Sequence, residues 1–383
     1  MIFTRKVSRP IFFLLFILAL SISAVASTTQ AATTTMLHAQ RTHSGNMVPM
    51  IAGTVTEFPI PTPGSQPVGI TSGPCGDGTQ CLWFTESHSN KIGKIITTGL
   101  HTGQITEYSL PSSPANVDAE PEGITSGPCG DGTQCLWFTE FSQIYGNNIG
   151  KITTNGQVTL YPIPTAKSEP ESITPGPCGD GTTCLWFTEF NANNIGKITL
   201  SGQITEYAVP TANSEPASIT SGPDGNIWFT EFMGENIGQI TPGGQITEYQ
   251  LPSPQPFSIA NDITSGPDGK LWFSLIVFPA SQENLQGTSK IGQIDPSTHL
   301  ITESQPLPNP QCVPNAITTG SDGKLWFTEY YQIGTITIGD NITEYPLPSG
   351  SIGNLPDQIT GGPDNNLWFT EFSGNNIGRI TTN

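Results

Sequence analysis

A set of acidic and amide side chains stands at matching places along the chain, near the start of successive repeat units. These residues are Glu120, Glu122, Glu169, Glu171, Glu215, Asn261, Asp262, Asn315 and Asp357. Carboxylate and amide oxygens suit hard cations such as Mg²⁺ or Ca²⁺, and crowding raises the pKa of a carboxyl group until it can act as a base. We therefore take the set as candidate metal ligands, Glu120 and Glu122 first, or catalytic groups. The alternative is an acidic rim that only favours solubility.

Histidine is the usual residue for proton transfer near neutral pH, and the chain has five. His38 and His43 precede the repeats, whereas His101 and His299 fall in turns expected on the face away from the acidic set. His88 follows a strand on the same side as that set. It is the one histidine kept as a catalytic candidate, and a merely solvated loop histidine is the alternative.

All seven tryptophans are followed by phenylalanine, and six of these pairs continue as Thr-Glu. The glutamates are Glu86, Glu140, Glu189, Glu231, Glu329 and Glu371. Recurrence in nearly every unit indicates a structural role, such as accepting backbone N–H bonds at a strand end, because a site normally needs asymmetry. Glu371 is also kept as a candidate metal ligand. The Trp-Phe pairs are expected to pack between sheets.

The tryptophans recur at intervals of 42 to 54 residues, and such periods are typical of propeller blades. One unit divides into four short strands, at residues 218–221, 227–231, 236–241 and 245–249, separated by Gly, Pro and Asp turns. Four strands repeated seven times predict an all-β, seven-bladed β-propeller.

The two ends of the repeat region complement each other. Residues 376–381 form a third strand with no fourth after it, and residues 54–61 form a fourth strand with no blade before it. Joining them completes the seventh blade and removes open sheet edges. The propeller domain is therefore predicted to span residues 53–383.

The N-terminus has the pattern of a targeting segment. Arg5, Lys6 and Arg9 precede an apolar run at residues 11–20, and residues 24–26 read Ala-Val-Ala. This pattern predicts a secretory signal peptide at residues 1–26 and a secreted, extracellular protein, with an uncleaved anchor as the alternative. Residues 27–52 are polar and aperiodic and predict a disordered tether. No later apolar run is long enough to span a membrane.

Six cysteines form three pairs within a shared Gly-Pro-Cys-Gly-Asp-Gly-Thr-x-Cys-Leu-Trp segment. The pairs are Cys75 with Cys81, Cys129 with Cys135, and Cys178 with Cys184. Each pair flanks a lengthened hairpin loop, so three disulfides are expected in an exported protein. A metal-thiolate site is the rival interpretation, but the paired C-x₂-C spacing of zinc sites is lacking. Cys312 has no partner in the repeat and is either a free thiol or an intermolecular link.

The net charge of −18, from 31 acidic and 13 basic residues, argues against nucleic acid as a partner. Solubility or a cationic partner fits this charge better. We expect a monomer.

The repeat as a whole resembles a known family. Its motif is Leu-Trp-Phe-Thr-Glu, then Asn-x-Ile-Gly-Lys-Ile-Thr, then Gly-x-Ile-Thr-Glu-Tyr, preceded by Pro-x-x-Ile-Thr-x-Gly-Pro-Asp-Gly. Over about residues 53–383 this is similar to the streptogramin lyases of the virginiamycin B lyase family. The resemblance implies a seven-bladed propeller that gives antibiotic resistance by opening cyclic depsipeptides of the streptogramin B type. The implied reaction is a Mg²⁺-dependent elimination at the ester C–O bond.

The family's chemistry lies in two histidines and two metal-binding glutamates, at the start of the sixth and seventh blades and after the last tryptophan. This chain departs from that pattern. Asn315 and Asp357 stand in the two histidine positions, and Leu355 and Phe372 stand in the two glutamate positions, with Glu371 one residue early. The resemblance thus makes Asn315 and Asp357 the first catalytic candidates.

The fifth unit breaks the repeat, because it reads Trp-Phe-Ser-Leu from Trp272 and then carries a long, partly apolar insertion. Insertions of this kind tend to lie on the binding face. Leu275 and Phe278, with Asn261 and Asp262, are therefore candidate substrate contacts. A partner contact or a tolerated surface insertion is the alternative.

Three functions follow for the ligand face. The first is a lyase for a small cyclic peptide, with a rearranged base and metal site. The second is a non-catalytic module that binds an extracellular ligand or protein. The third is a metal-dependent lactonase-like hydrolase, suggested only by the carboxylate and amide rim.

Overall fold

The computed structural model describes residues 52–111, 119–142, 146–252, 257–278, 288–309, 313–348 and 354–382. One compact unit spans Ile51–Asn383. The expected signal peptide, nearly all of the expected tether, and Cys312 lie outside the described residues.

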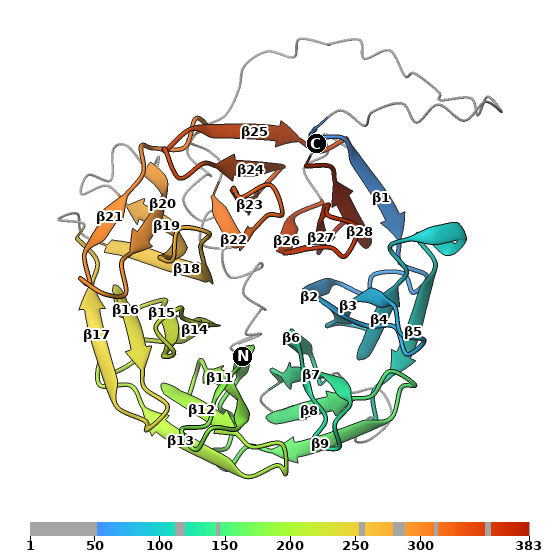
Figure 1. Ribbon diagram of the computed structural model, residues 1–383, viewed down its shortest axis with the longest axis horizontal. Helices are drawn as coiled ribbons and strands as arrows, with labels where there is room; N and C mark the ends of the chain where they lie inside the picture. The colour runs from blue at the N-terminus through green and yellow to red at the C-terminus, as the bar shows by residue number, and fades with distance from the viewer. Residues whose placement is uncertain are drawn as a thin grey trace, which may run out of the picture. The chain divides into compact units, whose positions relative to one another are not determined.

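Seven four-stranded antiparallel sheets are arranged in a ring, as Figure 1 shows. The first blade contains β2 (Pro67–Pro74), β3 (Gln80–Glu86), β4 (Lys91–Ile95) and β5 (Ile105–Ser109), with a 3₁₀ turn at Gly99–His101. The second contains β6 (Pro121–Pro128), β7 (Gln134–Glu140), β8 (Asn148–Ile152) and β9 (Val158–Pro162). The third contains β10 (Pro170–Pro177), β11 (Thr183–Glu189), β12 (Asn194–Ile198) and β13 (Ile204–Ala208). The fourth contains β14 (Pro216–Ser221), β15 (Ile227–Glu231), β16 (Asn236–Ile240) and β17 (Ile246–Gln250).

The remaining blades follow the same order from the centre of the ring outwards. The fifth contains β18 (Phe257–Ser265), β19 (Leu271–Phe278), β20 (Thr288–Ile294) and β21 (Ile301–Glu303). The sixth contains β22 (Pro314–Thr319), β23 (Leu325–Glu329), β24 (Gln332–Ile336) and β25 (Ile342–Pro346). The seventh contains β26 (Pro356–Gly361), β27 (Leu367–Glu371) and β28 (Asn376–Ile380), and its outer strand is β1 (Val55–Pro59).

Ring closure is as the sequence predicts. β1 pairs antiparallel with β28, with Val55 opposite Ile380 and Pro59 opposite Asn376. The first strand of the domain thus hydrogen-bonds to the last one, and the seven-bladed prediction is confirmed. In the described part of the chain, no helix is long and apolar enough to cross a bilayer.

A phenylalanine and a glycine that recur in every blade pack against each other. Phe187 is fully buried, and its ring covers Gly196 on the neighbouring strand so closely that a Cβ there would lie 2.1 Å from Cζ. The equivalent phenylalanine covers the equivalent glycine in every blade. A side chain in place of the glycine would displace the ring, which explains the Ile-Gly pair in each third strand.

The indole N–H of each buried tryptophan donates a hydrogen bond to one of two kinds of acceptor. In blades without cysteines an aspartate accepts the bond, as Asp224 Oδ1 does from Trp228 Nε1 at 3.0 Å. In the cysteine-bearing blades a proline carbonyl accepts instead, as that of Pro177 does from Trp186 at 3.1 Å. The cysteine loop thus changes the acceptor and leaves the buried donor satisfied, as a buried donor requires.

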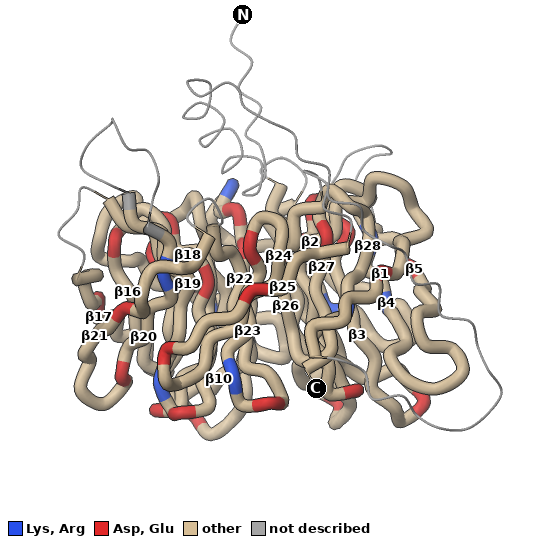
Figure 2. The backbone as a smooth tube through the Cα atoms, turned by 90° about the horizontal axis from the view of Figure 1, so that it is seen from above, with Lys and Arg blue, Asp and Glu red and all other residues tan. Residues whose placement is uncertain are grey.

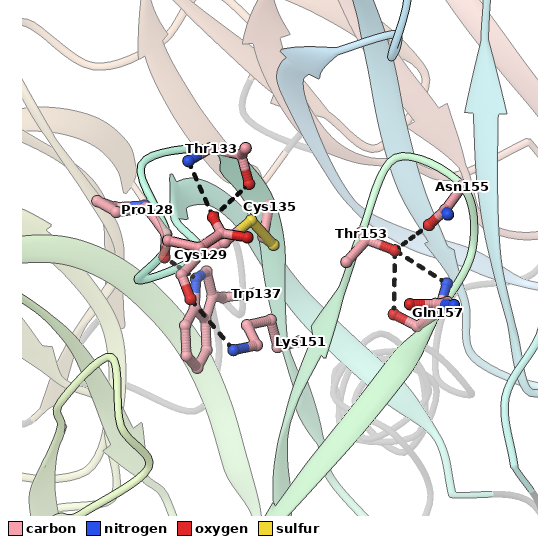
Figure 3. Close-up of a disulfide and its surroundings, with 10 residues drawn as sticks. Pro128, Cys129, Thr133, Cys135, Trp137, Lys151, Thr153, Asn155 and Gln157 are labelled. Atoms are coloured by element: carbon pink, nitrogen blue, oxygen red, sulfur yellow. Dashed lines mark hydrogen bonds between the residues drawn. A yellow bond between two sulfur atoms is a disulfide. The ribbon is translucent and has the colours of Figure 1, made fainter.

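The three predicted disulfides are present. Cys75 is bonded to Cys81, Cys129 to Cys135, and Cys178 to Cys184, each with 5.1 Å between Cα atoms. Figure 3 shows the second of these beside Trp137, with Lys151 Nζ donating to the carbonyl of Cys129 at 3.3 Å. Each disulfide closes the short loop that precedes the second strand of its blade.

Neighbouring blades also meet at their outer edges. Gly202, with φ of +91°, lies against the ring of Tyr161 from the preceding blade, and a Cβ there would approach to 2.3 Å. In the fifth blade His299 takes this place and stacks on Tyr249 with 4.5 Å between ring centroids. His299 therefore packs between blades, away from the acidic set.

Candidate functional site

The candidate site is built on the innermost strand of each blade. In every blade the pairing between this strand and its neighbour shifts register near its start, for example between Pro121 and Ile124. We call the first residue inside this bulge the slot residue. In blade order the slot residues are Val68, Glu122, Glu171, Ala217, Asn261, Asn315 and Asp357. The innermost strands surround the centre of the ring (Figure 1), so the bulges bring the slot residues to the channel mouth.

A hydroxyl group holds each bulge and joins it to the next blade. Thr328 Oγ1 accepts a bond from the backbone N–H of Ala316 in its own blade at 2.9 Å, and donates to the carbonyl of Asp357 in the next blade at 2.7 Å. The same double contact recurs around the whole ring. The hydroxyls belong to Thr85, Thr139, Thr188, Thr230, Ser274, Thr328 and Thr370.

The residue types alone did not indicate that these hydroxyl groups hold the slot residues in place. The signal was in the repeat, since Thr or Ser follows Trp-Phe in all seven units. It gave no sign that the hydroxyl reaches across to the next blade. The slot residues are thus held in place by a closed ring of hydrogen bonds.

Three slot residues form a hydrogen-bonded chain along one side of the channel mouth. Asn261 Nδ2 donates to Asn315 Oδ1, and Asn315 Nδ2 donates to Asp357 Oδ1. Asn261 and Asp357 are only 5% and 6% exposed. Asn315, a candidate catalytic residue, therefore contacts both the other candidate catalytic residue, Asp357, and the candidate substrate contact Asn261. An amide donor on Asp357 favours its ionised carboxylate.

Glu122 is the second carboxyl group of this site. It is 6% exposed, and Ser87 Oγ donates to its Oε1 at 3.2 Å. Burial raises the pKa of Glu122 well above its usual 4.5, and the charges of Asp357, Glu171 and Glu120 raise it further. The neutral form of Glu122 is therefore favoured over that of an ordinary glutamate.

The side chain of Asp262 links its own blade to the two neighbouring blades. Ser218 Oγ donates to its Oδ1, and the backbone N–H of Ile317 donates to its Oδ2 at 2.7 Å. These contacts tie the fourth, fifth and sixth blades together next to the Asn261–Asn315 bond. The structure thus places Asp262 beside the site as a bridge, with both carboxylate oxygens engaged.

Glu120 lies just before the first proline of its inner strand and has a φ of +52°. Its carbonyl accepts the N–H of Phe141 at 2.9 Å, which fixes the loop above the strand. Glu169, Glu215 and Leu355 occupy the same place and also have positive φ. Glu120 is close enough for its charge to act on Glu122, so the structure brings these two predicted metal ligands together.

Glu371 does not join them. Its Oε2 accepts bonds from the side-chain amides of Asn354 and Asn376, at 3.1 and 2.8 Å, and it faces Glu57 within the seventh blade. The described residues contain no group of three or more His, Cys, Asp or Glu side chains arranged to hold a metal ion. Leu355 and Phe372 stand in the two positions where the resemblance implies metal-binding glutamates, so these residues do not fit Mg²⁺, whose ligands are oxygens. The Mg²⁺ expectation stays a prediction from the resemblance.

The expected role of the repeated Trp-Phe-Thr-Glu glutamates needs a correction. We predicted that they accept backbone N–H bonds. Instead Oε2 of Glu231 accepts from the side chain of Asn236 at 3.0 Å, while its Oε1 is buried without a hydrogen-bond partner. The strand-end N–H groups nearby bond to backbone carbonyls, as that of Phe232 does to Glu215.

The remaining candidates lie in different surroundings. His88 is exposed in the loop after β3, and its backbone N–H donates to Ser65. Leu275 is fully buried in the core cluster with Trp228 and Phe273, which places it inside the protein. Phe278 ends β19, and its side chain lies outside the described residues. Figure 2 shows Asp and Glu at both edges of the ring, with few Lys and Arg.

The arrangement offers acid–base chemistry. Two carboxyl groups in different surroundings interact at the channel mouth: Asp357 accepts an amide hydrogen bond, and burial raises the pKa of Glu122. Environments that push the pKa values of two neighbouring groups apart are how sites assign an acid and a base.

Comparison with known proteins agrees with the fold. A family model described as the virginiamycin B lyase family matches residues 22–275 and 118–383. A crystal structure of virginiamycin B lyase from Staphylococcus aureus is similar at 36% identity, with a TM-score of 0.69, over 86% of this chain and 99% of that one. A streptogramin B lyase structure is similar at 37% identity, with a TM-score of 0.70, over 86% and 98% of the two chains.

A third similar structure is a catalytically inactive His-to-Ala variant of the Staphylococcus aureus enzyme with quinupristin. It has 36% identity and a TM-score of 0.70, over 86% of this chain and 99% of that one. No curated protein matches the chain. The similarity extends over the whole propeller, so this chain belongs to the virginiamycin B lyase family.

Proposed function

We propose that this protein is an exported carbon–oxygen lyase that opens the ester bond of a compact cyclic depsipeptide, such as a type B streptogramin, at the channel mouth. The observation that carries the proposal is the pair formed by Asp357 and Glu122. Asp357 stands at one of the two positions where the resemblance implies a catalytic histidine, and it interacts with Glu122, whose pKa is raised by burial.

The step uses Asp357 as the base. Its carboxylate removes the proton α to a carbonyl of the bound peptide, and the electrons of that C–H bond form a C=C double bond to the adjacent carbon. The C–O bond from that carbon to the ester oxygen breaks, and its electron pair leaves with the carboxylate. Glu122 gives its proton to this leaving group, and Asp357 then passes its proton to Glu122 through solvent. The product is linear and has the mass of the substrate.

Asn315 supports this step by holding the base. It donates to Asp357 and accepts from Asn261, so the Asp357 carboxylate is oriented by a neighbour that is itself fixed. A base held in one rotamer is better positioned for proton abstraction than a free side chain.

Export is supported by the three disulfides, which form and persist in oxidising compartments. A substrate from outside the cell would meet the enzyme there.

The test is mass spectrometry of a type B streptogramin incubated with the purified protein, with and without chelator. A ring-opened product of unchanged mass, identified by its fragments and absent with D357N, is the expected result. A product heavier by one water would indicate the lactonase-like hydrolysis instead.

A non-catalytic ligand-binding propeller is the second candidate, and one observation favours it. Asn261, Asn315 and Asp357 bond to one another, as groups that form a fixed recognition surface do. Calorimetry that detects binding of the intact peptide, with no product over long incubation, would establish this alternative and refute the lyase.

A further inference from the structure

Away from the channel, six blades contain a buried carboxyl group that the proposed function does not use. These are the glutamates of the Trp-Phe-Thr-Glu motif, each 1% exposed or less. In each of them Oε1 is buried without a hydrogen-bond partner. The residues are Glu86, Glu140, Glu189, Glu231, Glu329 and Glu371. An ionised carboxylate needs donors at both oxygens to be stable inside a protein.

In five of these blades a second glutamate from the outer strand faces the first. Glu206, which lies opposite Gly196 in the ladder, acts on Glu189 in the third blade. Glu206 itself accepts the backbone N–H of Thr165 at 3.0 Å, a bond that favours its ionised form. The five pairs are Glu86 with Glu107, Glu189 with Glu206, Glu231 with Glu248, Glu329 with Glu344, and Glu371 with Glu57.

Few other charges reach these carboxyl groups. Lys91 acts on Glu86 in the first blade and also pairs with Glu107 at 3.3 Å. In the second blade Leu160 stands opposite Gly150, where other blades have the second glutamate, and Glu140 faces only the amide of Asn148. In the other four blades, the pKa of the buried glutamate is affected by the facing carboxyl group and by neutral hydrogen-bond donors.

We propose that these six glutamates form a pH-dependent lock on the ring of blades. In mildly acidic surroundings each is a neutral carboxylic acid, and four of them, Glu86, Glu189, Glu231 and Glu371, share their proton with the facing carboxylate. In alkaline surroundings each loses that proton, and its blade is left with a buried, poorly solvated charge.

The electrostatics agree with this geometry. Burial raises the pKa of Glu86, Glu140, Glu231 and Glu371 to about 7. Burial raises the pKa of Glu189 and Glu329 to about 8, and the facing carboxylates add to the shift. A facing carboxylate has the same effect in the first, fourth and seventh blades.

The direction of the pH effect follows from linkage. In the unfolded chain these groups ionise near pH 4.5, and in the folded protein they ionise at about 7 to 8. Between these values the folded protein binds more protons, so stability falls as pH rises from about 4.5 to about 8. Since one pKa unit is a factor of ten, each group can change the folding constant by at most about 300-fold where its pKa is about 7, and by about 3000-fold where its pKa is about 8.

The surface aspartates affect the stability of the protein in a different pH range. Hydrogen bonds to Thr79, Thr133 and Thr182 hold the pKa values of Asp77, Asp131 and Asp180 below 3.8. Their contribution is complete above about pH 4 and is lost only as pH falls below it. The protein should therefore be most stable near pH 4 to 5.

The test compares Glu189→Gln with the unsubstituted protein in urea unfolding at pH 5 and pH 8. Glutamine keeps an acceptor for Asn194 and offers an amide donor to Glu206. We expect the variant to match the parent within about twofold at pH 5 and to have at least a tenfold higher folding constant at pH 8. Glu235→Gln, at a half-exposed turn, is the matched control and should change neither value.

Two results would overturn the lock. One is a Glu189→Gln variant whose advantage is the same at both pH values. The other is a parent protein whose stability rises between pH 5 and pH 8. Infrared spectra of the folded protein at pH 6 give an independent readout, because neutral carboxyl groups absorb apart from carboxylates. That band should be present and weaker in Glu189→Gln, and its absence from the parent would also refute the proposal.

Discussion

Asn315 on β22 donates its side-chain amide to Oδ1 of Asp357 on β26, the two positions where the family pattern has histidines. Where the resemblance implies an imidazole pair, this chain has an amide–carboxylate pair. Asn315 has no group that titrates, so in the proposed function proton transfer falls to carboxyl groups. The interaction of Asp357 with buried Glu122 supplies two of them.

The first prediction concerns the base. D357N keeps the shape of the side chain but removes its charge, so we expect kcat for ring opening to fall by about 10²–10⁴-fold. KM should change little if Asp357 acts mainly in the chemical step. The measurement is steady-state kinetics on a type B streptogramin by liquid chromatography.

E171Q is the matched control for D357N, because Glu171 occupies the equivalent slot of another blade. E171Q also removes a charge that raises the pKa of Glu122, so it is compared with D357N below the alkaline limb of the pH–rate profile. It should retain most of the activity. Equal losses in both variants would mean that the acidic rim acts as a whole and that Asp357 is not the base.

The second prediction concerns the acid and its pH dependence. Glu122 must be protonated to assist the leaving group, so the rate should fall as pH rises through its raised pKa. The bond from Ser87 lowers that pKa, because it favours the ionised form. S87A should therefore move the alkaline limb of the pH–rate profile to higher pH. A limb that stays in place in S87A would show that another group titrates.

The seven-bladed ring could be predicted from the sequence because the residues that form each blade lie close together in the chain and recur from blade to blade. Each blade carries its own Trp-Phe pair, its own Ile-Gly strand and its own turn residues, and the two half-blades at the ends have one way to pair. The disulfides followed from the same repetition, since each cysteine pair, such as Cys129 and Cys135, spans one loop.

The site was harder to predict because its contacts cross between blades. The sequence marked Asn261, Asn315 and Asp357 as equivalent positions but gave no sign that they hydrogen-bond in a chain. It also suggested Leu275 as a ligand contact, because the partly apolar insertion of the fifth unit was expected to lie on the binding face. In the fold this position is part of the core, where leucine fills the space of a buried glutamate.

The third prediction tests the hydroxyl ring. Thr188 Oγ1 accepts the N–H of Ser172 at 3.0 Å and donates to the carbonyl of Ala217 at 2.8 Å. T188V leaves both backbone groups buried without this partner, so the free energy of unfolding should fall by about 1–3 kcal/mol. Urea unfolding measures this loss, with T205V on the exposed face of β13 as the control. A loss of the same size in T205V would point to β-strand propensity and not to the hydroxyl contact.

The fourth prediction concerns the third disulfide, between Cys178 and Cys184. Replacing both cysteines by alanine frees a short loop in the unfolded chain, so stability should fall by about 2 kcal/mol. The ring should still close, because Trp186 donates its indole N–H to the carbonyl of Pro177, which the substitution leaves in place. Unfolding of the parent with reductant should give at least this loss, since reduction breaks this bond together with the other two. If the double variant were as stable as the parent, the disulfide would add nothing beyond the indole bond.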